Sequence, residues 1–451
     1  MKIRSFDGER AVSAFGAGLS LLVILTCSGS AELGRAGDLG APTGERAPAP
    51  AAPDPVGGAW VGATASAPAA SAPPASTATA KGAVAIPAPH FYAALRELEL
   101  GRRNRHVRTV WYGDSHSAAD FLGQAVRDGL KRFPSGGPGH LLLGVKPYRH
   151  GLVKSEAIGS LRIEPSSPAL GQRQGDGVFG LGGVRAVPEA WEAKLLLTPN
   201  PRAIRGRARW ELIYRLPPGA SFRFRIGSGA PIEVNAKTAP KPLKPGQLAR
   251  IEREASPTDA LEISGGYGSP QLFGVILESS EPGLVIDTLG INGARATTPL
   301  GWDEPSFAAE VAARAPELFV LAYGTNEAFD TRSADKAVEP LRRLIERLRH
   351  AAPGADCLVV GPPDAGDPDG GSHPRIAAIE VEQRRVAGEL TCGFFSLRAV
   401  MGGDGSYTRW AKEKPPLAGF DRVHLTPAGY TKLGEALARA LLESYSASTT
   451  R

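Results

Sequence analysis

The residue types that acyl transfer requires occur at five positions of the sequence. This reaction needs a hydroxyl nucleophile, an imidazole base, a carboxylate that orients the base, and hydrogen-bond donors for the oxyanion. Ser115, His424 and Asp421 offer the first three groups. The oxyanion donors would be the backbone N–H groups of Ser115 and Gly293 and the side-chain amide of Asn326. The set predicts catalysis through an acyl-enzyme, with Ser115 as the acylated residue.

Each of these residues also has an ordinary structural interpretation. Gly293 could serve only a turn, and Asn326 could form an Asx-turn. Asp421 and His424 could be loop residues that precede a helix. The catalytic interpretation therefore depends on the combination, and on elements that bring the residues together.

Ser115 is expected on a tight turn between a strand and a helix. The run 107–112 is apolar and β-branched, and the glycine and Asp114 that follow break it. Apolar and small residues then recur at helical spacing from 118 to 130. The Ser115 hydroxyl can face a cleft, with its N–H near the positive end of the helix. We expect Asp114 to cap the turn and His116 to be structural or to face the substrate.

Strands and helices alternate again after residue 281. Strands are expected at 284–287, 318–323, 357–360 and 392–397, and helices at 305–315, 334–351, 376–390 and 427–442. This alternation predicts a parallel, doubly wound α/β sheet with helices on both faces. In such a sheet, sites form beyond the carboxyl ends of the strands, where Ser115, Gly293 and Asn326 would lie.

Residues 146–281 have a different texture and are expected to form an inserted domain. Short alternating runs are separated by Gly/Pro turns, which predicts a β-sandwich or jelly roll. The α/β domain would then comprise residues 89–145 and 282–451. The insert is expected to bind saccharide through aromatic residues such as Tyr148, Phe179 and Trp191, or to act only as a lid or spacer.

The N-terminal region has the pattern of an exported protein. Basic residues precede an apolar run at 11–25, so residues 1–31 are expected to be a secretory signal. Cys27 lies in a sequence similar to a bacterial lipoprotein cleavage box, which leaves lipidation and a soluble product both open. Residues 32–88 are rich in Ala and Pro and are expected to be a disordered, extended tether. The expected location is the periplasm or cell envelope, with an outer-membrane lipoprotein as one form.

Composition narrows the range of partners and cofactors. The formal net charge is +6, and the basic residues are not interleaved with aromatic ones, which argues against nucleic-acid binding. The spacing of His and Cys favours no metal site, and the Gly-rich stretch 171–183 lacks the context of a phosphate loop, so no cofactor is expected. Cys357 and Cys392 begin expected neighbouring strands, and we expect them to be two buried thiols.

Four ordered sequence blocks resemble those of the GDSL/SGNH hydrolase superfamily. The blocks are Gly113-Asp114-Ser115, Gly293, Gly324-Thr325-Asn326-Glu327 and Asp421-Arg422-Val423-His424. The resemblance implies the flavodoxin-like SGNH fold, with Ser115, Asp421 and His424 as catalytic residues and Ser115, Gly293 and Asn326 as the oxyanion hole. The chain departs from the pattern at His116, where Leu is usual, and at Glu327, where Asp is common.

A finer resemblance is to the bacterial peptidoglycan O-acetylesterases. It rests on the segments 112–121, 289–294 and 323–327, on Met401-Gly402-Gly403, and on Trp410. It implies a carbohydrate-binding-module-like insert and removal of O-acetyl groups from a cell-wall polysaccharide, with peptidoglycan as the expected partner. Two other functions stay open: an O-acetyltransferase of the same fold, and a non-catalytic envelope protein that binds peptidoglycan or another carbohydrate.

Overall fold

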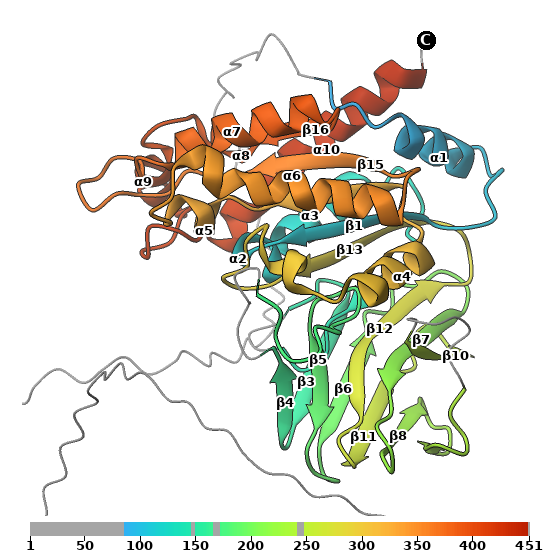
Figure 1. Cartoon of the computed structure of the whole chain (residues 1–451). Helices are drawn as coiled ribbons and strands as arrows, with labels where there is room; N and C mark the ends of the chain where they lie inside the picture. The colour runs from blue at the N-terminus through green and yellow to red at the C-terminus, as the bar shows by residue number, and fades with distance from the viewer. Residues whose placement is uncertain (1–84, 146–148, 166–171, 241–247, 450–451) are drawn as a thin grey trace, which may run out of the picture. The chain divides into compact units, whose positions relative to one another are not determined.

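A five-stranded parallel sheet forms the centre of the α/β domain. The computed structural model describes residues 85–145, 149–165, 172–240 and 248–449. The strand order is β13-β1-β14-β15-β16 (Figure 1). The bounds are β1 Val107–Gly113, β13 Leu284–Gly290, β14 Leu318–Ala322, β15 Asp356–Gly361 and β16 Gly393–Ser396. In chain order this is 2-1-3-4-5, the flavodoxin-like order, so the predicted doubly wound sheet is confirmed.

Helices cover both faces of this sheet. Successive residues of each strand point to opposite faces, so both faces present apolar side chains that helices must bury. Trp111 of β1 lies in one hydrophobic core, whereas Val110 and Tyr112 lie in the other. The first core is closed by α1 Pro89–Glu99, α3 Phe121–Gly129, α8 Leu397–Met401, α9 Ser406–Ala411 and α10 Pro427–Thr449. The second is closed by η1 Thr298–Gly301, α4 Glu304–Arg314, α5 Thr325–Ala328, α6 Ala334–Ala351 and α7 Ile376–Glu389.

The region between α3 and β13 contains two antiparallel sheets. One has the order β10-β7-β12-β5-β4, with β2 on β12, and the other has the order β3-β6-β11-β8-β9. The bounds are β2 Gly139–Leu141, β3 Val153–Ile158, β4 Leu161–Glu164, β5 Arg185–Pro188, β6 Lys194–Pro199, β7 Ala208–Arg215, β8 Ser221–Ile226, β9 Ile232–Val234, β10 Ala249–Ala255, β11 Leu261–Tyr267 and β12 Gln271–Ser279. The two sheets share one hydrophobic core. The jelly-roll topology of the insert and its limits at residues 146 and 281 remain predictions. The antiparallel pairing begins before residue 146, because β2 pairs with β12.

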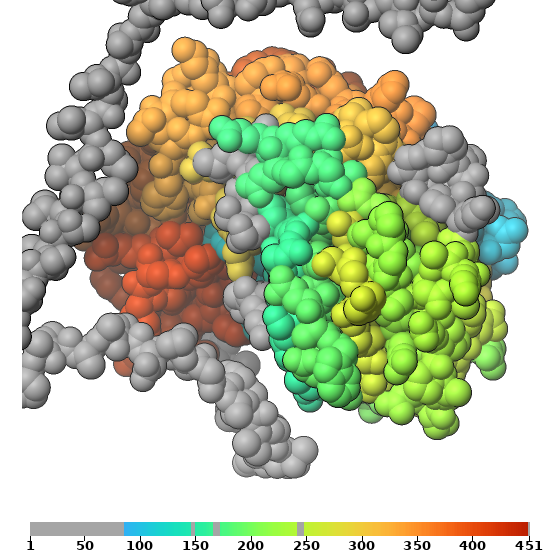
Figure 2. Space-filling model, turned by 60° about the horizontal axis from the view of Figure 1, so that its bottom comes forward, coloured from blue at the N-terminus to red at the C-terminus, as the bar shows by residue number. Residues whose placement is uncertain are grey.

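The space-filling view shows this insert as adjoining green and yellow-green segments beside the orange and red parts of the α/β domain (Figure 2). Of the aromatic residues expected to stack on sugars, Phe179 is buried in the core beneath β1 and is unavailable for that role. Trp191 is 82% exposed. Tyr148 lies outside the described residues, as do Cys27, the expected signal at 1–31 and most of the expected tether. None of the helices in the described part of the chain has the length and apolar character of a membrane span.

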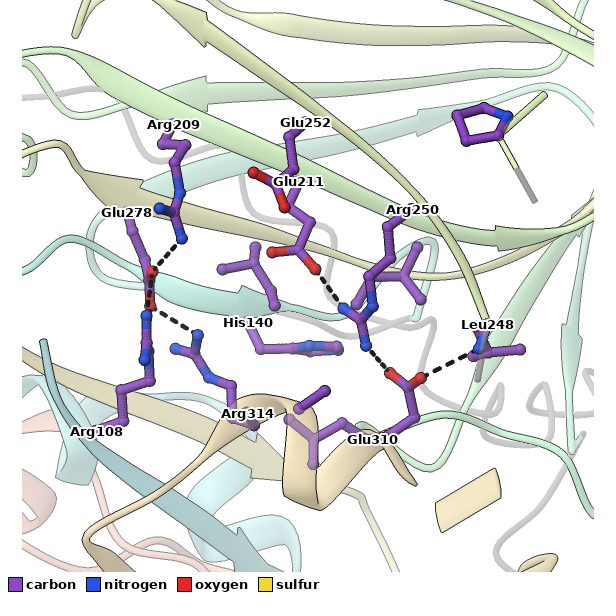
Figure 3. A pocket seen from close by; sticks show the side chains of 15 residues that line it. Arg108, His140, Arg209, Glu211, Leu248, Arg250, Glu252, Glu278, Glu310 and Arg314 are labelled. Atoms are coloured by element: carbon purple, nitrogen blue, oxygen red, sulfur yellow. Dashed lines mark hydrogen bonds and ion pairs between the residues drawn. The ribbon is translucent and has the colours of Figure 1, made fainter. Parts of the chain in front are cut away.

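Buried ion pairs join the insert to the α/β domain. Glu278 of β12 receives two hydrogen bonds from Arg108 of β1, both 2.9 Å long, and pairs with Arg314 of α4 at 2.6 Å. Arg314 also pairs with Asp287 of β13. Burial alone would raise the pKa of Glu278, but the two guanidinium groups hold it well below its usual value. Arg108, Glu278 and Arg314 line a cavity of about 400 Å³ between the domains (Figure 3), so ion pairs add to the apolar contact that Phe179 makes with the core on β1.

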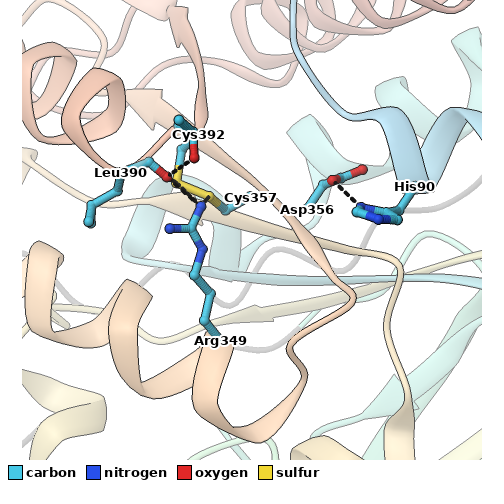
Figure 4. The surroundings of a disulfide bond; sticks show 7 residues. His90, Arg349, Asp356, Cys357, Leu390 and Cys392 are labelled. Carbon is cyan, nitrogen blue, oxygen red and sulfur yellow. Dashed lines mark hydrogen bonds and ion pairs between the residues drawn. A yellow bond between two sulfur atoms is a disulfide. The ribbon is translucent and has the colours of Figure 1, made fainter.

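The expectation of two free thiols is wrong, because Cys357 and Cys392 form a disulfide bond (Figure 4). Leu358 of β15 pairs in register with Gly393 of β16, so the residues that precede them lie opposite each other. Their Cα atoms are 4.9 Å apart, within the range that a disulfide spans. The Arg349 guanidinium lies 3.2 Å from the Cys357 sulfur. Pairing depends on the register of two strands, which the positions of the cysteines alone do not reveal.

We therefore expect an alkylating reagent to modify Cys357 and Cys392 in the denatured protein only after reduction. The bond closes a loop with a sequence separation of 35 residues. Its loss in Cys357→Ser should lower the free energy of unfolding by about 3–4 kcal/mol. Peptide mass mapping measures the labelling, and denaturant unfolding measures the stability. Labelling of either residue before reduction would contradict the bond.

Candidate active site

Three neighbouring strands end at the same edge of the parallel sheet and lead to the predicted site residues. Gly113 at the end of β1 pairs in register with Gly290 of β13 and with Ala322 of β14. The candidate residues follow these three positions by two to four residues: Ser115, Gly293 and Asn326. The expectation that strand ends would deliver them to one edge is met by the register.

The turn that carries Ser115 is fixed by its neighbour Asp114. The Asp114 carboxylate accepts a hydrogen bond of 3.0 Å from the backbone N–H of His116, which is the capping role expected for it. Burial raises the pKa of Asp114 to about 8. Ser115 is the first residue of α2, Ser115–Ala118, and the first N–H of a helix has no partner within the helix.

The helix expected from residue 118 onward is interrupted at Asp120, which separates α2 from α3. Asp120 adopts a left-handed conformation, with φ of 58°. Its buried carboxylate accepts hydrogen bonds of 2.7 Å from Thr288 and from the backbone of Gly151, and it pairs with Arg127. These contacts with β13 and with the insert stabilise the unusual conformation and hold α2 as a separate turn.

Ser115, His424 and Asp421 form a continuous hydrogen-bonded chain. The His424 Nε2 atom lies 2.8 Å from the Ser115 Oγ, and the Nδ1 atom lies 2.7 Å from the Asp421 Oδ2. The side chain of His424 is 45% exposed, so the chain opens to solvent. A hydroxyl, an imidazole and a carboxylate are thus arranged in the order that acyl transfer requires.

The loop that carries Asp421 and His424 is held by backbone contacts. The Asp421 Oδ1 accepts hydrogen bonds from the backbone of Val423 at 2.9 Å and of His424 at 2.8 Å. Burial alone would raise the pKa of Asp421, but these two N–H groups and the His424 ring lower it, so the carboxylate stays ionised. The Tyr407 hydroxyl lies 2.8 Å from the His424 carbonyl oxygen. No sequence signal had indicated this support from Tyr407.

Asn326 is tied to the loop that contains Gly293. Its side-chain amide donates a hydrogen bond of 2.9 Å to the carbonyl of Ala294. The amide nitrogen carries two hydrogens, so this contact orients the group and leaves one hydrogen for another acceptor. Glu327 accepts hydrogen bonds from the backbone of Ala296 at 2.8 Å and of Gly324 at 3.0 Å. Glu327, noted above only as a departure from the family pattern, thus joins the two loops.

His116 lies against His424. Its ring centroid is 5.5 Å from that of His424, and its Nδ1 atom lies 2.9 Å from the Tyr430 hydroxyl. The side chain is buried, and burial lowers its pKa to about 3. A neutral ring at this position adds no positive charge next to His424. Among the described residues, no group of three or more His, Cys, Asp or Glu side chains is placed to hold a metal ion.

Comparison with known proteins gives a family match over residues 255–432, to the GDSL-like lipase/acylhydrolase family. This stretch contains Gly293, Asn326, Asp421 and His424, whereas Ser115 precedes it. No curated protein sequence matches the chain.

Among solved structures, a peptidoglycan O-acetylesterase matches with a TM-score of 0.67 and 24% identity, covering 80% of this chain and 97% of the other. A carbohydrate acetylesterase from Sinorhizobium meliloti matches over 36% of this chain and 79% of its own, with 17% identity and a TM-score of 0.28. An acetyl xylan esterase matches over 36% of this chain and 80% of its own, with 21% identity and a TM-score of 0.27. The first likeness shows a shared fold over most of the chain.

Proposed function

We propose that this chain, whose residues 255–432 match the GDSL-like lipase/acylhydrolase family, is an exported serine esterase that removes O-acetyl groups from peptidoglycan. The observation that carries the proposal is the hydrogen-bonded chain from Ser115 through His424 to Asp421. The catalytic roles of these three residues and the oxyanion roles of Gly293 and Asn326 are part of the proposal.

In the proposed reaction, the Ser115 Oγ attacks the acetyl carbonyl carbon while His424 Nε2 takes the hydroxyl proton. The oxyanion of the tetrahedral intermediate receives hydrogen bonds from the N–H groups of Ser115 and Gly293 and from the free amide hydrogen of Asn326. Collapse of the intermediate breaks the ester bond, and His424 returns its proton to the sugar hydroxyl that leaves. Water, deprotonated by His424, then attacks acetyl-Ser115 and releases acetate and the free serine.

Two features support an acetylated cell-wall polysaccharide as the substrate. One solved structure of similar fold is a peptidoglycan O-acetylesterase, and the predicted signal and tether would place the enzyme in the cell envelope. Lipidation at Cys27 remains part of the sequence prediction. In this proposal the insert positions the polymer over Ser115, and its exposed Trp191 offers one contact with a sugar ring.

The test is acetate release from O-acetylated peptidoglycan sacculi by the purified full chain. We expect release from native sacculi and none from the same sacculi after chemical de-O-acetylation, which serves as the matched control. Cleavage of p-nitrophenyl acetate without release from sacculi would disprove the proposed substrate. Transfer of acetyl to an added sugar in excess of hydrolysis would instead identify a transferase, because the two reactions share the acyl-enzyme and differ in the acceptor.

A further inference from the structure

The residue that precedes Asp421 in the chain, Phe420, has a fully exposed side chain. It lies on the loop between the paired residues Ala418 and Leu425. The backbone N–H of Gly419 donates a hydrogen bond of 2.8 Å to the His424 carbonyl across this loop. An ordered loop therefore presents an aromatic ring without any packing partner, beside the carboxylate that orients the catalytic base.

A second exposed aromatic side chain belongs to the segment that follows β14. Phe329 directly follows α5, the turn that carries Asn326, and is 50% exposed. Its ring centroid lies 4.4 Å from that of His373. Phe329 thus follows the proposed oxyanion residue Asn326 by three positions in the chain, and Phe420 directly precedes Asp421.

One segment of the loop between β15 and α7 joins the two aromatic positions. The backbone N–H of His373 donates a hydrogen bond of 2.7 Å to the Ala365 carbonyl, and that of Gly366 donates one of 2.8 Å to the Arg422 carbonyl. Phe329 packs against His373 of this segment. At the other aromatic position, Arg422 lies two residues after Phe420. These contacts connect the two aromatic positions through residues 365–373 and Arg422, which together we call the strip.

We propose that Phe329 and Phe420 are stacking subsites for pyranose rings of the glycan chain that flanks the acetylated sugar. A pyranose presents apolar C–H faces and a polar rim, which suits an isolated aromatic ring surrounded by polar groups. Apart from Pro368, the exposed and half-buried side chains of the strip are polar, among them Arg422 and His373, which argues against a lipid surface. This proposal rests on the proposed function and names how the same site holds its polymer.

The test compares Phe420→Ala, Phe420→Leu and Phe420→Trp with the wild type on two substrates, solubilised O-acetylated glycan chains and p-nitrophenyl acetate. We expect Phe420→Ala to lower the ratio of kcat/KM for the glycan to that for the small ester about tenfold, chiefly through KM. Phe420→Leu should lower it several-fold, since an aliphatic side chain offers no flat face. Phe420→Trp should retain the ratio. Val381→Ala, an exposed apolar position on α7, is the matched control and should behave as wild type.

Binding of the glycan chains to Ser115→Ala, with and without Phe420→Ala, is measured in parallel. An unchanged ratio and unchanged binding in Phe420→Ala would overturn the subsite while the proposed function stands. Full retention by Phe420→Leu would show apolar docking in place of stacking. If the wild type cleaves only the small ester, the proposed substrate is wrong, and the binding measurement alone then decides the subsite: no binding, or binding that Phe420→Ala leaves unchanged, rejects it.

Discussion

Replacement of Ser115 by alanine should lower the turnover of p-nitrophenyl acetate by about 10⁴-fold or more and leave the protein folded. The substitution removes the atom that attacks the ester in the proposed mechanism, the Oγ that lies 2.8 Å from His424 Nε2. What remains is the oxyanion hole and substrate binding, which accelerate hydrolysis far less than the intact set. Alanine is well tolerated at the start of a helix turn, so we expect Tm to stay close to that of wild type.

Ser117→Ala is the matched control for this experiment. Ser117 lies on the same short helix, but its hydroxyl accepts a hydrogen bond of 3.1 Å from the Trp111 indole and does not contact His424. Its loss should lower stability by about 1 kcal/mol and spare turnover. A fluorophosphonate probe should label Ser117→Ala and fail to label Ser115→Ala. Near-normal turnover in Ser115→Ala would exclude the proposed nucleophile.

Much of this site could be predicted because its residues follow strand ends. The apolar run of β1 and its break at Gly113 locate one turn, and the same pattern locates the turns after β13 and β14. In a parallel sheet all carboxyl ends point to one edge. Local patterns in three separate segments thus predict a common position in space, and Asp114 was correctly expected to cap its turn.

Features that depend on pairing between distant segments could not be predicted. The disulfide requires the register of β15 against β16, and the break at Asp120 requires partners such as Thr288 that lie far along the chain. The support of the Asp421 loop by Tyr407 is likewise a tertiary contact. The exposure of Phe420 could not be predicted for another reason: phenylalanine is usually buried, and nothing local indicates that this one is exposed.

Asn326→Ala should lower kcat about 100-fold on both p-nitrophenyl acetate and solubilised O-acetylated glycan chains, as expected for the loss of one oxyanion donor. The effect should fall on kcat more than on KM, because the proposed contact forms with the oxyanion rather than with the ground-state carbonyl. The same substitution also removes the hydrogen bond to the Ala294 carbonyl. That loss should lower the free energy of unfolding by about 1 kcal/mol, so denaturant unfolding accompanies the kinetics.

Asn292→Ala is the matched control for the loss of an asparagine side chain near the site. Asn292 is exposed on the loop that precedes Gly293, and no role in the reaction is assigned to it, so this variant should keep wild-type kinetics. If Asn326→Ala loses stability but keeps kcat within about threefold, the amide only ties two loops together and is no oxyanion donor. A 100-fold loss of kcat at a Tm close to that of wild type would leave the electrostatic role as the explanation, since a misplaced loop would also alter KM.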